Sequence, residues 1–271
     1  MISRMGAALP AGKADPLGGR ALITGATSGI GLAFARALAA RGSDVVLVAR
    51  NKTRLTSTAA ELHQRHGVEA EILAVDLSES TGVAAVVDRL SGNPQIDILI
   101  NNAGHGLHVS LLAEDTSSID QAHSVMVGAV LALGGAAGRA MKARGHGVII
   151  NVGSVASLLP MGAYSAIKSW VATYSESLAL ELTGTGVVVT TLLPGWVRTE
   201  FHQRAGIRTD AIPWVLWLDA DRVARDCLCD AARGRLRSVP SPRYVALAFL
   251  AQHAPRPLVR RVAAAVRGSR A

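Results

Sequence analysis

The stretch Thr24-Gly25-Ala26-Thr27-Ser28-Gly29-Ile30-Gly31 follows a short apolar run at residues 20–24 and precedes a helical pattern at residues 32–38. An apolar run of this length predicts a buried strand. Glycines between a strand and a helix let a ligand approach the backbone, and the helix amino terminus offers N–H groups to an anion. This order therefore predicts a phosphate site. A turn that needs glycine for tightness alone is the alternative.

Apolar runs and helical patterns alternate along the rest of the chain. We expect strands near residues 20–24, 44–48, 70–75, 97–101, 147–152 and 186–193. Such alternation indicates repeated βαβ units with right-handed crossovers. The 271 residues, of which 49% are hydrophobic, suffice for one large core. We predict an α/β fold: a single Rossmann-type doubly wound parallel sheet of about seven strands, with helices on both faces.

A second motif, Tyr164-Ser165-Ala166-Ile167-Lys168, places a phenol and an ammonium four residues apart in a segment with a helical pattern. Residues at this spacing share one face of a helix. A lysine cation beside a tyrosine hydroxyl favours the phenolate, so we expect the pKa of Tyr164 to lie below about 10. Tyr164 would then serve as an acid or a base near neutral pH.

Six motifs follow one another in the order known from a single protein family. They are Thr24–Gly31, Asp76-Leu77, Asn101-Asn102-Ala103-Gly104, Ser154, the pair Tyr164 and Lys168, and Pro194-Gly195-Trp196-Val197-Arg198-Thr199. Over about residues 18–200 the chain resembles the short-chain dehydrogenase/reductase family. From Trp196 onward it is most similar to ketoacyl-reductase-like bacterial members.

The resemblance implies hydride transfer between a nicotinamide and a carbonyl or hydroxyl carbon. It implies that Tyr164 exchanges a proton with the substrate oxygen, that Ser154 hydrogen-bonds this oxygen, and that Lys168 lowers the Tyr164 pKa and holds the nicotinamide ribose. With Arg50 added for its charge, the expected cofactor-binding residues are Gly25, Thr27, Ser28, Gly29, Ile30, Gly31, Arg50, Asp76, Leu77, Asn102, Ala103, Gly104, Tyr164, Lys168, Pro194, Gly195, Val197 and Thr199.

The end of the second expected strand bears on the choice of cofactor. An acidic residue at this place binds the ribose 2′-hydroxyl and repels a 2′-phosphate. The chain has Ala49 there, followed by Arg50, and Lys52 and Arg54 add positive charge. A guanidinium suits a phosphate, so we expect NADP(H) rather than NAD(H). The alternative is that Arg50 merely begins an exposed helix.

Two positions depart from the family pattern. Met126 stands near the place where many members have an asparagine that extends the proton path from the lysine, and a thioether donates no hydrogen bond. Water or backbone would replace that relay, or the proton path would be slower.

Ser154 and Tyr164 are also closer in sequence than is usual, so we expect a tighter loop at residues 158–162.

The residues expected to line the cleft are apolar and favour a hydrophobic ketone, such as a ketoacyl chain; they are Leu158, Leu159, Met161, Trp196 and Trp214. The segment 200–220 is expected to form a substrate lid, although Trp214 and Trp217 could instead be hydrophobic anchors. The predicted function is that of an NADPH-dependent oxidoreductase. The alternatives are an NADP(H)-binding redox sensor without turnover, and a dehydratase or epimerase on the same scaffold.

Positive charge is concentrated at the carboxyl end. Residues 231–271 contain nine arginines and no acidic residue, so the rest of the chain is close to neutral despite a total of +8. This distribution does not support a nucleic-acid surface. In the basic extension 240–271, Leu258, Val259, Val262 and Val266 have helical spacing. The helix is expected to pack on the body or on another subunit; attraction to anionic lipid or to an acidic acyl-carrier partner is the alternative.

The remaining features are organisational. Residues 1–18 lack a signal pattern and are expected to form a flexible leader before a single domain at 19–271. No uncharged apolar run is long enough to span a membrane. Cys227 and Cys229 suit neither a disulfide nor a metal pair, and a reducing cytoplasm is the default compartment. His105 and His108 either approach the substrate or face solvent.

Assembly is expected from the family resemblance alone. Its members pair through two long helices beside the active site, here near residues 115–143 and 163–183, so we expect a homodimer or homotetramer. Small residues at Gly128, Gly134, Gly135 and Gly138 would allow a close helix approach. The same glycines could equally pack against the sheet.

Overall fold

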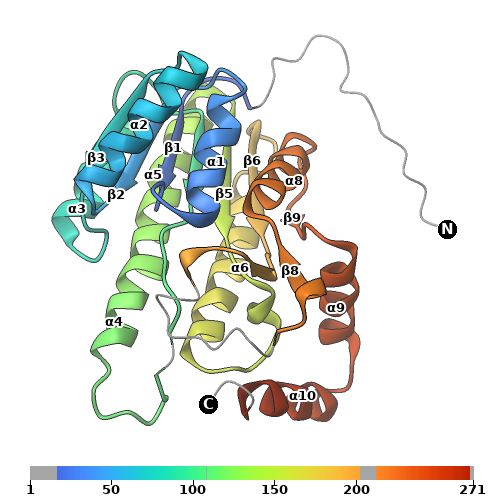
Figure 1. The fold of residues 1–271 in the computed structure, drawn as a ribbon. Coiled ribbons are helices and arrows are strands. Elements are labelled where there is room, and N and C mark those ends of the chain that lie inside the picture. Colours follow the sequence, from blue (N-terminus) through green and yellow to red (C-terminus); the bar gives the residue numbers. More distant parts are fainter. Residues whose placement is uncertain (1–16, 108, 202–211, 269–271) are drawn as a thin grey trace.

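The computed structural model of the chain describes residues 17–107, 109–201 and 212–268. Its centre is one parallel sheet in the strand order β3-β2-β1-β4-β5-β6-β9 (Figure 1). The strands are β1 (Ala21–Thr24), β2 (Val45–Ala49), β3 (Ala70–Ala74), β4 (Ile98–Asn101), β5 (Gly147–Val152), β6 (Val187–Leu192) and β9 (Arg237–Ser238). The order reverses direction between β1 and β4, so the predicted doubly wound sheet is confirmed.

Helices between the strands cover both faces of the sheet. They are α1 (Gly29–Ala39), α2 (Lys52–His66), α3 (Ser80–Ser91), α4 (Ser117–His123), α5 (Ala129–Arg144), α6 (Ala163–Glu181) and α8 (Ala220–Ala232). Two more helices, α9 (Pro242–His253) and α10 (Arg256–Gly268), follow the last strand. Shorter elements are the π-helical turn η1 (Ser124–Gly128), the 3₁₀ turns η2 (Val155–Leu158) and η3 (Trp214–Leu216), and the strand pair β7 (Trp196–Val197) and β8 (Trp217–Leu218).

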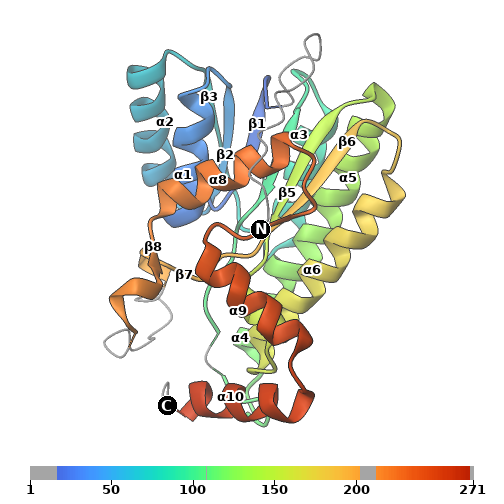
Figure 2. The same ribbon diagram turned by 90° about the vertical axis from the view of Figure 1, so that its right-hand side faces the viewer.

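Each buried strand supplies two hydrophobic cores because its side chains point alternately to opposite faces. In β1, Ile23 packs in the core covered by α1, α2 and α8. Its neighbour Leu22 packs in the core covered by α3, α5 and α6. Figure 2 shows these two groups of helices on opposite sides of the sheet. Near-continuous apolar strands are therefore what this fold requires.

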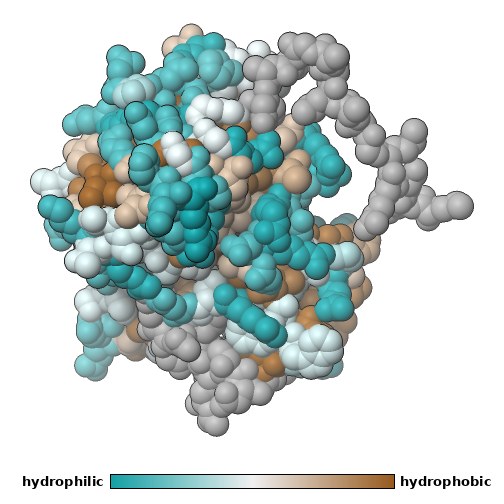
Figure 3. Space-filling view, turned by 45° about the horizontal axis from the view of Figure 1, so that its top comes forward, coloured by the Kyte–Doolittle hydropathy of each residue, from teal (hydrophilic) through white to brown (hydrophobic). Residues whose placement is uncertain are grey.

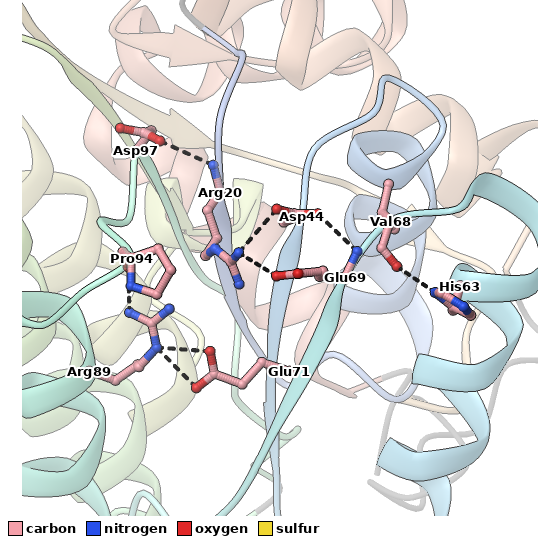
Figure 4. A network of polar contacts seen from close by, with 9 residues as sticks. All are labelled: Arg20, Asp44, His63, Val68, Glu69, Glu71, Arg89, Pro94 and Asp97. Atoms are coloured by element: carbon pink, nitrogen blue, oxygen red, sulfur yellow. Dashed lines mark hydrogen bonds and ion pairs between the residues drawn. The ribbon is translucent and has the colours of Figure 1, made fainter.

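The amino ends of the strands are held by a polar network (Figure 4). The Arg20 guanidinium contacts Asp44 at 3.1 Å and Glu69 at 2.7 Å, which joins the beginnings of β1, β2 and β3. The backbone N–H of Arg20 also donates to Asp97, just before β4, at 3.1 Å. Nearby, Arg89 of α3 pairs with Glu71 of β3 at 2.9 Å. Charged groups at this edge therefore bind one another.

The six strands placed from sequence are all present, and the structure adds β9 as the seventh. Most of the predicted leader, residues 1–16, lies outside the described residues, but Leu17 is buried in the core. In the predicted lid, residues 202–211 also lie outside the described part. Its remainder contains η3 and β8, and the basic extension contains α9 and α10.

One helical stretch, Ser117–Arg144, is long and apolar enough to cross a membrane by length and composition. It runs through α4, η1 and α5, and 56% of its most apolar window is buried inside the fold. A core helix has the same properties, so this stretch is weak evidence for a membrane span.

Candidate active site

A cleft of about 1380 Å³ opens at the carboxyl ends of the strands. It is lined by the glycine turn after β1, by the segments that follow β2 to β6, by the start of α6, and by α9 and α10. Every residue predicted from sequence to bind cofactor or to act in catalysis lines this cleft, except Gly31. The fold therefore brings the predicted set together at one place.

The glycine turn is hydrogen-bonded to the loop that follows β4. The Asn102 side-chain amide donates to the carbonyl oxygens of Thr24 at 2.8 Å and of Gly25 at 3.3 Å. In return, the Thr24 hydroxyl oxygen accepts the backbone N–H groups of Asn102 and Ala103, each at 2.9 Å. Gly25 has a φ of +67°, which favours glycine. The turn is thus fixed by the chain itself.

Gly31 contributes by packing rather than by facing the cleft. A Cβ at this position would lie 2.3 Å from the Gly25 carbonyl oxygen and 2.4 Å from the Asn102 amide, so only glycine fits. Gly29 has a φ of +54° and packs on Thr199. The side chain of Ser28 makes no capping bond at the start of α1. The first N–H groups of α1 have no partner within the helix, and they lie beside the cleft, as a diphosphate group requires.

Two arginines mark the end of the cleft near β2. Arg50 is 70% exposed and lies 3.6 Å from a carboxylate oxygen of Asp76. Burial raises the pKa of Asp76, but hydrogen bonds from Ser78 and the charge of Arg50 outweigh it, so this pKa lies below its ordinary value. Arg54 binds both oxygens of Glu200, at 2.8 and 3.2 Å. Both guanidiniums line the cleft at this end.

Glu200 belongs to a short segment that contacts three parts of the cleft. Its neighbour Thr199 packs on Gly29, and Glu200 itself binds Arg54 on α2. The ring of Phe201 lies 6.0 Å from that of Tyr164, at an interplanar angle of 57°. The segment therefore links the glycine turn, Arg54 and Tyr164.

Ser154, Tyr164 and Lys168 converge on the floor of the cleft. Tyr164 lies in the first turn of α6, and the Ser154 hydroxyl, which follows β5, lies near enough to the phenol to influence its pKa. Lys168, one helical turn later, is buried and donates from Nζ to the Val152 carbonyl oxygen at 2.8 Å. Its Nζ lies 5.8 Å from the centre of the Tyr164 ring. The predicted shared helix face is present.

The predicted low pKa of Tyr164 is wrong for this structure. Burial raises the pKa of Tyr164 to about 12, and the nearby Ser154 hydroxyl offsets only part of that effect. Burial also lowers the pKa of Lys168 to about 8, which weakens its charge just above neutral pH. Desolvation thus dominates over the attraction expected between the cation and a phenolate. At neutral pH Tyr164 is a phenol that holds a proton.

Met126 occupies an apolar position behind the cleft. It is buried in η1, where it packs with Ala122, Val127 and Ile167. Its sulfur lies so close to Gly104 that a Cβ there would come within 2.8 Å. Met126 therefore joins η1 to the loop after β4 by apolar packing. Its thioether stands where many family members have an asparagine, so this side chain offers no hydrogen-bond donor to a proton relay.

Sequence reasoning missed Tyr244 and the contribution of α9. The Tyr244 hydroxyl accepts the backbone N–H of Trp196 at 3.0 Å and donates to the Leu216 carbonyl at 2.8 Å. Gly195 packs so tightly on this ring that a Cβ would overlap it. The start of α9 at Ser241-Pro242 has a sequence signal, since proline favours the first helical turn. No sequence pattern, however, indicates that α9 lies beside the cleft.

The histidines and tryptophans have separate outcomes. His105 lines the cleft, with Nδ1 at 3.1 Å from the Gly106 carbonyl oxygen. His108 lies outside the described residues. The ring centres of Trp217 and Trp196 lie 5.9 Å apart, as expected for a hydrophobic anchor, whereas Trp214 is largely exposed. Within the described parts of the chain, no group of three or more side chains is placed to hold a metal ion.

Comparison with known proteins agrees with this geometry. The family model for short chain dehydrogenase matches residues 20–209. A protein of Streptomyces virginiae, named as a ketoacyl reductase of the monensin polyketide synthase, is 41% identical over 68% of this chain and 72% of its own length. The chain belongs to the short-chain dehydrogenase family of oxidoreductases.

Two solved structures are similar over most of their length. A short-chain dehydrogenase from Sphingobium yanoikuyae in complex with NADPH has 36% identity and a TM-score of 0.79, covering 86% of this chain and 93% of that one. A bulky-bulky ketone specific alcohol dehydrogenase from Comamonas testosteroni has 32% identity and a TM-score of 0.75, covering 86% and 92%.

Proposed function

We propose that the protein is an NADPH-dependent reductase of hydrophobic ketones, with ketoacyl chains as the leading substrate class. The observation that carries this proposal is the convergence of Ser154, Tyr164 and Lys168 on a cleft that also holds the glycine turn. The apolar residues of the substrate side, among them Leu158, Leu159 and Met161, suit a hydrophobic substrate. The names of the relatives point the same way.

The residues present fit a dinucleotide cofactor. The glycine turn and the start of α1 would hold its diphosphate, and Arg50 with Arg54 would hold a 2′-phosphate. Asp76 and Leu77 would border the adenine, and Lys168 together with the 194–199 loop would hold the nicotinamide end. When bound, this cofactor supplies the hydride. The protein then has to orient the ketone and supply a proton.

Tyr164 is the proton donor in this mechanism. Because its pKa is raised to about 12, the hydroxyl carries its proton throughout the physiological range. It would donate this proton to the substrate oxygen as negative charge develops there. The Ser154 hydroxyl would donate a second hydrogen bond to the same oxygen. A tyrosine that starts protonated serves reduction directly, whereas oxidation first requires its deprotonation.

Steady-state kinetics with NADPH and NADH test this function. On a panel of ketones graded by chain length and ring count, we expect kcat/KM for NADPH to exceed that for NADH. The substitution Arg50→Asp should lower kcat/KM for NADPH by about 10- to 100-fold, since a charge-assisted contact becomes repulsive. NADH values should change little. Tight NADPH binding without oxidation by any ketone would instead support a redox sensor.

We also propose a homodimer or homotetramer, formed through the outer faces of α5 and α6. Leu131 on α5 and Leu180 on α6 are both exposed. Gly134 packs on Tyr174 within the same chain, so this glycine already has an internal contact. Light scattering after gel filtration should give a mass of at least two chains, and Leu180→Glu should lower it.

We propose a reducing cytoplasm as the compartment, where Cys227 and Cys229 stay free thiols.

A further inference from the structure

The mouth of the cleft is apolar and exposed, in contrast to its buried floor. Leu111, Leu247, Leu250 and Leu258 line the cleft and are nevertheless about half exposed or more, from 48% to 64%. Leu112, next to the cleft-lining Leu111, is 91% exposed. These side chains come from the loop before α4 and from α9 and α10. They therefore surround the opening from separate segments.

The apolar character continues outward over α9. Val245 and Phe249 are both more than half exposed, although they do not line the cleft. Figure 3 shows hydrophobic residues among hydrophilic ones at its lower right, the side on which α9 lies. Exposed apolar side chains gathered around one opening in this way mark a place of contact with another molecule or with a membrane.

Positive charge lies beside this apolar rim. Arg256, Arg260 and Arg261 of α10 are exposed, and no ion pair is formed by them within residues 17–107, 109–201 and 212–268. On the same helix, Val259 and Ala263 are buried against the protein. Helix α10 thus turns small apolar residues inward and arginines outward. No acidic residue follows Asp230 to neutralise them.

We propose that this cleft-mouth surface, formed by Leu111, Leu112, α9 and α10, docks on membranes that contain anionic lipid. Protruding aliphatic side chains next to exposed arginines are what an interfacial membrane site requires, because the former enter the acyl boundary while the latter bind head-group phosphates. The whole body of the enzyme stays outside the bilayer. Figure 1 shows α10 at the far end of the molecule from the amino edge of the sheet, where it can reach a flat surface.

Two other occupants fit the surface less well. A second copy placed there by a two-fold axis would bring the arginines of one α10 against those of the other, because α9 and α10 contain no acidic residue. A protein that covered the whole rim would also close the opening that the rim surrounds. A bilayer satisfies the charges and the apolar side chains together, and it leaves a path for an apolar molecule into the cleft.

The first test measures binding of the full chain to vesicles by co-sedimentation. Vesicles of phosphatidylcholine with phosphatidylglycerol should bind the protein, and vesicles of phosphatidylcholine alone should bind it at least about tenfold more weakly. Binding should fall between 50 mM and 500 mM salt, since exposed charges are screened over about 10 Å at 0.1 M. Equal binding to both vesicles, or none to either, would overturn the proposal.

Variants locate the surface. The double variant Arg260→Glu/Arg261→Glu should lose at least about tenfold in vesicle binding. Leu112→Ser should also weaken it while leaving the salt dependence in place. The matched control is Arg225→Glu/Arg233→Glu, which makes the same charge change at exposed positions on and after α8, away from the cleft. If this control loses as much binding as the α10 variant, general charge and not this surface is responsible.

Activity separates the docking proposal from the proposed function. With a small water-soluble ketone, the Arg260, Arg261 and Leu112 variants should retain the kcat of the parent chain, since none of these residues lines the cleft. Circular dichroism should show an unchanged melting temperature. Loss of vesicle binding with intact turnover supports the docking surface. Saturable binding of an acidic carrier protein by the α10 arginines, without any vesicle binding, would replace it.

Discussion

The two edges of the same sheet use charge in opposite ways. At the amino edge, Arg20 binds Asp44 and Glu69 directly, so these charges hold neighbouring strands together. At the carboxyl edge, Tyr164 is partly buried and Lys168 is buried; both have shifted pKa values and line an open cleft. The first edge contributes to stability, whereas the second carries groups whose chemistry is set by burial. Substitutions at the two edges should therefore affect different measurements.

Tyr164→Phe should give the largest separation between activity and stability. Removing the proposed proton donor should lower kcat by about 10²–10⁴-fold, the usual size of acid–base assistance. The ring and its contact with Phe201 remain, so the melting temperature should change by no more than a few degrees. NADPH binding, followed by fluorescence, should persist. A variant with more than a tenth of the parent kcat would contradict the assigned role.

Lys168→Met should lower activity and yet stabilise the fold. The pKa of Lys168 falls from 10.5 to about 8 on burial. Holding the charged ammonium in the folded state therefore lowers the free energy of unfolding, and this loss is fully present below pH 8. Replacing it should raise the melting temperature at pH 6 by several degrees, and the gain should vanish as the pH approaches 10.5. A lower melting temperature at pH 6 would contradict this account.

The parent enzyme should show the same titration in its kinetics. As the pH rises above about 8, Lys168 loses its charge while Tyr164 remains protonated. The kcat/KM for ketone reduction should then be level at lower pH and should fall above about pH 8. A pH profile that stays level to pH 10 would show that the ammonium form is not needed.

Arg20→Met should have the reverse effect of Tyr164→Phe. Loss of the guanidinium leaves Asp44 and Glu69 facing each other at the amino edge, and should cost about 1–3 kcal/mol of unfolding free energy in urea. The cleft is lined by other residues, so kcat and KM should stay within twofold at 25 °C. Arg65→Met, which removes an exposed pair with Glu61, is the control and should cost much less.

Glu200→Gln should have the smallest effect, confined to the cofactor. In the proposed cofactor complex Glu200 would compete with the ribose phosphate for Arg54, so its loss should lower the Kd for NADPH by about two- to fivefold. The Kd for NADH should not fall. Isothermal titration at low and high salt measures both. A weaker affinity for NADPH would show that Glu200 positions Arg54 rather than competing for it.

Sequence reasoning located the parts of the fold that depend on local patterns. The six longer strands and the glycine turn have periodicity or composition of their own, and the spacing of Tyr164 and Lys168 follows from helix geometry. Strand β9 has only two residues, too few for a pattern. The Arg54–Glu200 pair joins residues 146 apart. The pKa of Tyr164 depends on what packs around it, so its direction could not be obtained from spacing.

The hydrogen bonds of Asn102 have a consequence for affinity. The amide bridges the loops after β1 and β4 through hydrogen bonds within the chain, so the part of the cleft beside the glycine turn, where we propose that the diphosphate binds, is held by the protein itself. Binding that must first order a loop loses part of its free energy to conformational entropy. Here that ordering has already taken place during folding. Cofactor affinity should accordingly show little dependence on loop dynamics, and its association should need no slow isomerisation of the protein.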